Sequence, residues 1–191
     1  MERSFPLTRE RLGHDACGVG FIAARSAAPT HRTLRLAVAC LHNVDHRGAR
    51  SIDGTGDGAG IMTRIPYRVL ERDLAAAGIA APSRSRLGLL MVFLPRGDEA
   101  EARRVVEAAL GAEDVELLLW RRVPVGPRSL SETARASMPT IEQAVVAAPE
   151  GWSSIEFDRA LFLARRAAER GAARAGLDGF HVASASSETV V

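Results

Sequence analysis

The chain has 191 residues, of which 47% are hydrophobic and 25% charged, and its 25 basic residues nearly balance 23 acidic ones. This composition is that of an ordinary globular protein and excludes intrinsic disorder, collagen-like and coiled-coil architectures. All basic residues are arginine and the chain has a single asparagine, Asn43, a bias typical of a GC-rich genome. A net charge of +2 with interleaved signs argues against a nucleic-acid partner.

No apolar run reaches the roughly 20 residues that span a bilayer, and residues 1–16 are polar, without the hydrophobic stretch of a signal peptide. We therefore expect a cytoplasmic protein with no membrane partner. In a reducing compartment the two cysteines, Cys17 and Cys40, are expected to be free thiols.

Residues 17–24 are small and apolar with two glycines, which predicts a buried strand. Apolar residues recur at helical spacing over 31–44, so an amphipathic helix facing the core is predicted there. The segment 45–60 holds five glycines and is predicted to be a turn-rich loop. It leads into a predicted strand at 61–65, which Pro66 ends.

The second half mixes strands and helices. Asp98 is a candidate helix N-cap, Gly111 and Gly171 are candidate helix ends, and Ser153 with Glu156 forms a capping-box pattern. The predicted elements are strands at 87–94, 115–123, 141–148 and 180–185, and helices at 99–110 and from 153 to about 170. The irregular order favours an α+β architecture over a doubly wound parallel sheet. Because residues 187–191 also favour a strand, we expect the chain to be a fragment that ends inside one.

Cys17 is the first candidate catalytic residue. A thiol attacks as the thiolate, and its ordinary pKa of about 8.5 means that a base must take the proton. If residues 1–16 were removed, the new α-amino group, with a pKa of about 7.7–8.0, would supply that base. Inert packing of a buried cysteine is the competing interpretation.

Two other sites compete with Cys17. Gly54, Gly56, Gly58 and Gly60 suggest a phosphate-binding loop, but a strand-like run follows where such loops require a helix. A structured turn near a site is the favoured interpretation. Cys40, His42 and His46 could hold a metal ion, yet no second close pair of ligands completes a set of four, so a core cysteine with helix-end histidines is favoured.

Several distinctive motifs follow one another along the chain. The early ones are His14-Asp15-Ala16-Cys17-Gly18-Val19-Gly20-Phe21, His46-Arg47-Gly48-Ala49 and Thr55-Gly56-Asp57-Gly58-Ala59-Gly60-Ile61. The later ones are Trp120-Arg121-Arg122-Val123-Pro124, Met138-Pro139-Thr140-Ile141-Glu142-Gln143, Leu161-Phe162-Leu163-Ala164-Arg165-Arg166 and Ser184-Ala185-Ser186-Ser187-Glu188-Thr189-Val190-Val191. In this order and spacing the motifs resemble the glutamine amidotransferase domain of glutamate synthase large subunits, and the resemblance extends from about His14 to the last residue.

This resemblance implies a class II glutamine amidotransferase with the four-layer αββα sandwich of N-terminal nucleophile hydrolases, incomplete at its C-terminus. It implies a propeptide-like leader at 1–16 and an amidotransferase domain at 17–191. Cys17 would become the first residue, attack the side-chain amide of L-glutamine, release ammonia for glutamate synthesis and form a glutamyl thioester that water hydrolyses. Residues 47–60 would be scaffold near the nucleophile.

The family also has residues that this chain lacks. Its arginine for the glutamine α-carboxylate and its Asn-Gly oxyanion hole follow the point where this chain ends, and Asn43 is followed by Val44. Loss of one oxyanion donor costs about a hundredfold to a thousandfold in rate. We therefore expect little activity from this chain alone, with no cofactor in it and no metal. FMN, an iron–sulfur cluster and the 2-oxoglutarate site would lie in a synthase portion or partner. The alternative is a non-catalytic remnant or regulatory interaction module of the same fold.

Overall fold

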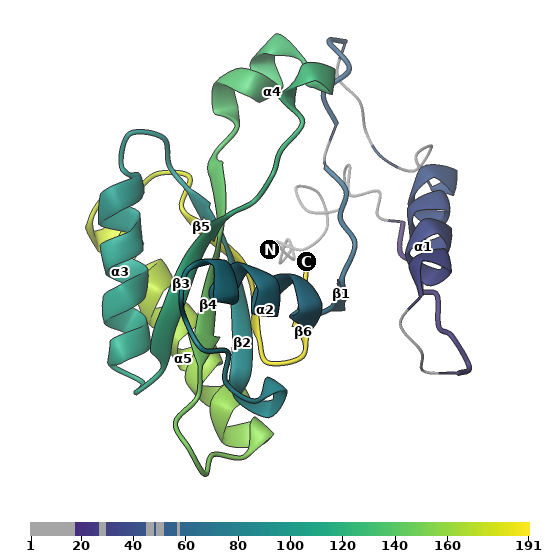
Figure 1. Ribbon diagram of the computed structural model, residues 1–191. Helices are drawn as coiled ribbons and strands as arrows, with labels where there is room; N and C mark the ends of the chain where they lie inside the picture. Colours follow the sequence, from purple (N-terminus) through teal and green to yellow (C-terminus); the bar gives the residue numbers. More distant parts are fainter. Residues whose placement is uncertain (1–17, 27–29, 45–47, 49–51, 57) are drawn as a thin grey trace, which may run out of the picture. The chain divides into compact units, whose positions relative to one another are not determined.

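The computed structural model describes residues 18–26, 30–44, 48, 52–56 and 58–191. These residues form two compact units. The N-terminal unit contains the described residues up to Ile61 together with Leu130–Arg135, and the C-terminal unit contains Met62–Ser129 and Ala136–Val191. Both units are drawn in Figure 1, and each is described by itself.

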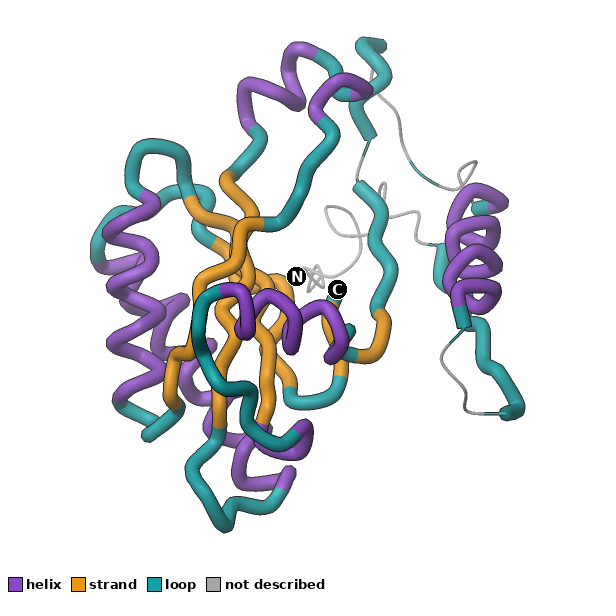
Figure 2. Tube along the Cα trace, viewed as in Figure 1, coloured by secondary structure: helices purple, strands orange, loops and turns teal. Residues whose placement is uncertain are grey.

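A four-stranded antiparallel sheet forms the centre of the C-terminal unit, and its strands run in the order β3-β4-β2-β5. A separate two-stranded sheet pairs β1 with β6, also antiparallel. The strands are β1 (Thr63–Arg64), β2 (Leu87–Leu94), β3 (Glu116–Arg122), β4 (Thr140–Ala147), β5 (His181–Ser186) and β6 (Thr189–Val190). Figure 2 shows the central strands in orange with helices on both sides.

The helices of this unit are α2 (Tyr67–Ala76), α3 (Glu99–Gly111) and α5 (Ser154–Arg174), with short 3-10 turns at Arg84–Arg86 and Pro127–Ser129. The remaining helices are α1 (His31–Asn43) in the N-terminal unit and α4 (Glu132–Ser137), in which the chain passes from the N-terminal to the C-terminal unit. None of the helices in the described part of the chain is long and apolar enough to cross a membrane.

Both faces of the central sheet are covered, because β2 alternates its side chains between two apolar clusters. Leu90, Val92 and Leu94 pack with α3 and α5 on one face. Leu87 and Leu89 pack on the other face with α2, with Ile65 next to β1 and with Val190 of β6. A continuous apolar run is what a strand buried on both sides requires. The unit is thus a helix layer, a sheet, and a layer holding α2 and the second sheet (Figure 1), and the predicted α+β class is confirmed.

Most predicted elements of the second half are confirmed within a few residues, and the Ser153–Glu156 capping box is present. Helices α2 and α4 were missed. Tyr67, Leu70 and Leu74, at helical spacing after Pro66, are the signal that could have revealed α2. Asp98 is the N-cap of α3 but makes no side-chain capping bond, and the Gly97 amide donates to the Glu99 carboxylate instead.

Of the two glycines predicted to end helices, one does so and one does not. Gly111 is the last residue of α3, whereas Gly171 lies within α5, which continues to Arg174. A Cβ at Gly171 would approach Val105 Cγ1 of α3 to 2.9 Å. Gly171 therefore permits close packing between two helices, and the left-handed turn that follows α5 falls at Gly176, with φ 68°.

The strand predicted over 17–24 is wrong for its described part. Gly18–Ala24 has no regular secondary structure, and Val19 and Phe21 are about 90% exposed, at 93% and 90%. None of the strands in the described residues pairs with this segment, so its backbone lacks the ladder that a strand requires. The helix over 31–44 is confirmed as α1, but none of its residues is buried, so its predicted packing into a core is not observed.

Candidate active site

The predicted nucleophile, Cys17, lies outside the described residues, as do His14 and His46. The chain immediately after it is described, and there Gly20 lies against the side chain of Cys40 in α1. A Cβ at position 20 would stand 2.7 Å from Cys40 Sγ, so only glycine fits there without movement. Cys40 is a partly buried free thiol. The Cys40 thiol therefore packs against the backbone at Gly20.

The glycine-rich loop turns at Gly54 and Gly58, whose φ angles of 81° and 90° favour glycine. Asp53 is bonded within this loop: the Thr55 amide donates to its Oδ1 at 3.0 Å and the Thr55 hydroxyl to its Oδ2 at 2.8 Å. These bonds, chiefly the one from the Thr55 hydroxyl, lower the Asp53 pKa to about 2. A permanently ionised carboxylate repels phosphate, and strand β1 follows the loop in place of a helix. Both features argue against nucleotide binding.

The histidines that the structure describes show no metal-binding arrangement. His42 is exposed in the last turn of α1, and His181 packs its ring at 6.0 Å from that of Phe93. Within the ranges that the structure describes, no three His, Cys, Asp or Glu side chains gather as metal ligands.

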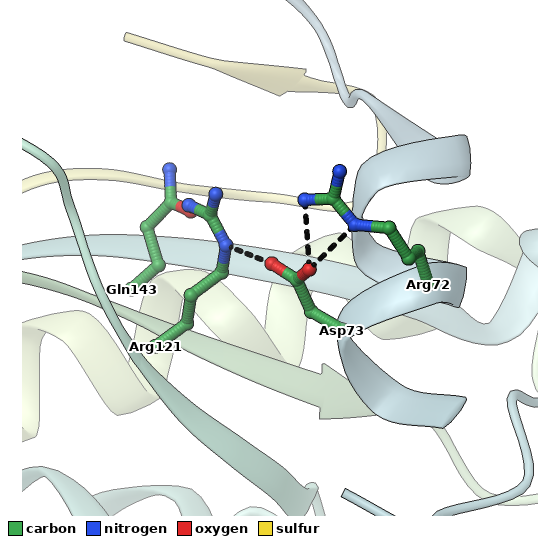
Figure 3. Close-up of polar contacts among 4 residues, drawn as sticks. All are labelled: Arg72, Asp73, Arg121 and Gln143. Carbon is green, nitrogen blue, oxygen red and sulfur yellow. Dashed lines mark hydrogen bonds and ion pairs between the residues drawn. The ribbon is translucent and has the colours of Figure 1, made fainter. Parts of the chain in front are cut away.

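A polar cluster of four residues joins α2 to strands β3 and β4 (Figure 3). Arg121 Nε donates to Asp73 Oδ2 at 2.6 Å, and Arg121 Nη1 donates to Gln143 Oε1 at 2.7 Å. Arg72 donates to Asp73 Oδ1 from both Nε and Nη2. Hydrogen bonds from Arg121 and then Arg72 hold the Asp73 pKa below its usual value. The cluster contains no nucleophile, and its bonds fasten α2 to the sheet.

Two motifs that are separated in the sequence meet in this cluster. Arg121 belongs to the Trp120–Pro124 motif and Gln143 to the Met138–Gln143 motif, and the antiparallel register places the two residues opposite each other. The neighbouring pair, Arg122 and Glu142, is also in register. Adjacent strand residues point to opposite faces, so Gln143 turns toward α2 and Glu142 toward α3.

Glu142 is a buried carboxylate with one charged partner. Arg103 of α3 donates to it twice, from Nε at 2.8 Å and from Nη2 at 2.6 Å. The Glu142 side chain is 6% exposed and that of Arg103 is 35% exposed. These hydrogen bonds raise the pKa of the Arg103 guanidinium. Glu142 of the Met138–Gln143 motif is therefore a structural residue, because its ion pair with Arg103 anchors α3 to β4.

A surface hollow of about 530 Å³ lies in the C-terminal unit. It is lined at the ends of β2, α4 and α5 by residues that include Phe93, Arg96, Asp98, Met138 and Asp178. Among the described residues of its lining there is neither a cysteine nor a histidine.

A comparison with protein families matches residues 17–191 to the class II glutamine amidotransferases. The match covers most of the chain, and the chain belongs to this family. Class II amidotransferases have the N-terminal nucleophile hydrolase fold, and the antiparallel α+β architecture is consistent with it.

The chain is similar to several curated glutamate synthases. The chain is 40% identical over 180 residues to ferredoxin-dependent glutamate synthase 2 of Synechocystis, with 93% of this chain and 11% of the relative covered. It is 36% identical over 182 residues to the NADPH glutamate synthase large chain of Azospirillum brasilense, covering 93% and 12%. The Bacillus subtilis large chain is 32% identical over 195 residues, covering 100% and 13%. The chain is thus homologous to a glutamine amidotransferase portion of glutamate synthase large chains and spans about a tenth of their length.

Proposed function

We propose that this chain is the glutamine-hydrolysing domain of a glutamate synthase-type protein, with Cys17 as its nucleophile. The observation that carries the proposal is the family match, which begins at Cys17 itself. A nucleophile at the first position of the domain is what an N-terminal amine can activate. Residues 1–16 would then be a leader that is removed before the enzyme acts.

The bond and proton changes of the reaction involve the cysteine, its own amine, the glutamine and a water molecule. The α-amino group takes the thiol proton, and the thiolate attacks the side-chain carbonyl carbon of L-glutamine. The carbon–nitrogen bond breaks, the amine returns the proton, and ammonia leaves behind a glutamyl thioester. Water then attacks the thioester, which yields glutamate and restores the thiol.

We propose that the ammonia is used by a synthase portion or partner subunit that holds FMN, an iron–sulfur cluster and the 2-oxoglutarate site. The sequence has two cysteines, fewer than the four thiolates that such clusters commonly require, so this chain does not fit the cluster by itself. A cytoplasmic location is part of the same proposal.

Two measurements on the purified chain test the nucleophile. Intact-mass spectrometry should show removal of residues 1–16, and an electrophilic glutamine analogue should add one label to Cys17. Covalent labelling is the better assay, since it needs one event per molecule while turnover without the Asn-Gly pair is expected to be slow. Cys17→Ala should abolish the label, whereas Cys40→Ala, the matched control, should keep it.

Some outcomes would contradict the proposal. A chain that keeps its leader and leaves Cys17 unlabelled would favour the non-catalytic interaction module of the same fold. In a protein that also carries the synthase portion, Cys17→Ala should abolish glutamine-dependent synthesis and leave ammonia-dependent synthesis intact. Persistent glutamine-dependent turnover in that variant would refute the assignment of Cys17.

A further inference from the structure

The glycine-rich loop is hydrogen-bonded to a segment far away in the sequence. Thr55 Oγ1 lies 2.8 Å from Ser131 Oγ, although the two residues are 76 positions apart. Ser131 in turn accepts from the Ala134 amide at 3.1 Å. The hydroxyls of Ser131 and Thr133 also bond the Asp53 carboxylate. All of these residues belong to the N-terminal unit. Leu130–Arg135 is part of that unit, although the residues before and after it in the sequence belong to the C-terminal unit.

The direction of each hydrogen bond follows from the number of protons available. An ionised carboxylate only accepts, so the single Thr55 hydroxyl proton is used in the bond to Asp53 Oδ2. The single Ser131 hydroxyl proton therefore points toward Thr55 Oγ1 and the Asp53 carboxylate, while the Ser131 oxygen accepts from the Ala134 amide. Protons thus point one way along the chain from Ala134 through Ser131 and Thr55 to Asp53. A one-way chain that begins at an amide and ends at a charge is cooperatively strengthened.

The loop needs such a tether for an entropic reason. The loop backbone is more flexible than that of other residue types, because it contains Gly54, Gly56, Gly58 and Gly60. Ordering it therefore costs more conformational entropy. Asp53 and Ile52 are exposed, so no apolar burial at these two positions offsets that cost. The hydrogen-bond chain joins this part of the loop to residues far away in the sequence.

We propose that Asp53, Thr55 and Ser131 form a clasp that holds the glycine-rich loop and the Leu130–Arg135 segment in one arrangement. Asp53 sets the direction of the bonds, and Ser131 links the two segments. Opening of the clasp releases both segments together, so the two behave as one cooperative element. This inference concerns the conformation of the N-terminal unit and does not depend on the reaction proposed for Cys17.

Amide hydrogen exchange, read by mass spectrometry on the full chain, tests the clasp. Asp53→Asn and Ser131→Ala should each increase exchange about fivefold to tenfold, the equivalent of one lost hydrogen bond, both in peptides over 52–56 and in peptides over 130–135. The double variant should exchange no faster than the faster single one, because either change opens the whole clasp. Asp98→Asn is the matched control, since Asp98 is exposed and makes no side-chain capping bond.

Exchange in β2 and β4 serves as the reference for correct folding, because these strands are buried in the C-terminal unit. The clasp is refuted if Ser131→Ala accelerates exchange only in its own segment, or if the effects of the two substitutions multiply in the double variant. Unchanged exchange over 52–56 in Asp53→Asn would equally overturn it.

Discussion

The ion pair between Arg103 and Glu142 predicts an asymmetric response to mutation. Glu142 lies on β4 with a side chain that is 6% exposed, whereas Arg103 on α3 is 35% exposed. Removal of Arg103 leaves a buried carboxylate with no charged partner. Removal of the charge on Glu142 leaves a guanidinium that can turn toward water. The two single substitutions therefore differ in cost although they break the same pair.

The magnitudes follow from these exposures. An unpaired buried charge costs about 3–5 kcal/mol, and we take the lower end for Arg103→Leu because the side chain opens toward solvent. Glu142→Gln keeps the volume and one acceptor, so it should cost about 1 kcal/mol. Loss of about 3 kcal/mol in a chain of this size lowers the melting temperature by roughly 6–12 °C.

Urea unfolding and thermal melts of the single variants measure this difference. Arg104→Leu is the matched control on the same helix: its pair with Glu101 is exposed on both sides, and its effect should stay within about 0.5 kcal/mol. The double variant Arg103→Leu with Glu142→Leu should regain most of the stability that Arg103→Leu loses. Equal costs for Arg103→Leu and Glu142→Gln would show that Glu142 is not effectively buried, and the reasoning would fail.

Three further predictions concern the helices and the polar cluster. Gly171→Ala places a methyl group 2.9 Å from Val105 Cγ1. Alanine gains about 1 kcal/mol from helix propensity, but the clash should still leave the fold about 1 kcal/mol less stable in urea unfolding. Adding Val105→Ala to the same chain should reverse this loss. Ser153→Ala removes the cap of α5 and should cost about 1 kcal/mol in the same assay, while a cost near zero would contradict the capping role. Because Asp73 has a lowered pKa, its stabilisation is complete above the ordinary carboxyl pKa of about 4 and fades as the pH falls below it. Arg121→Leu should flatten that acid loss in pH-dependent melts, and an unchanged slope would rule out the pair as its source.

Local signals in the sequence determined much of the C-terminal unit. The apolar run of β2 requires burial on both faces, and the structure places it between two neighbours in the sheet with an apolar cluster on each side. Ser153 and Glu156 satisfy the first amides of α5 within one turn, so the start of that helix needs no distant partner. The motif around Cys17 is also a local run of residues, so its resemblance to the family could be seen from sequence alone. Cys17 itself lies outside the described residues.

Other features were decided only by tertiary structure, because they depend on what lies opposite a residue. Gly171 resembles a helix terminator in the sequence, but a helix continues through glycine when a neighbouring helix leaves no room for a side chain. Arg121 and Gln143 become partners through the register of β3 on β4, which no local pattern specifies. Gly18–Ala24 has the residues of a strand and does not form one among the described residues, since a strand exists only where another strand receives its hydrogen bonds.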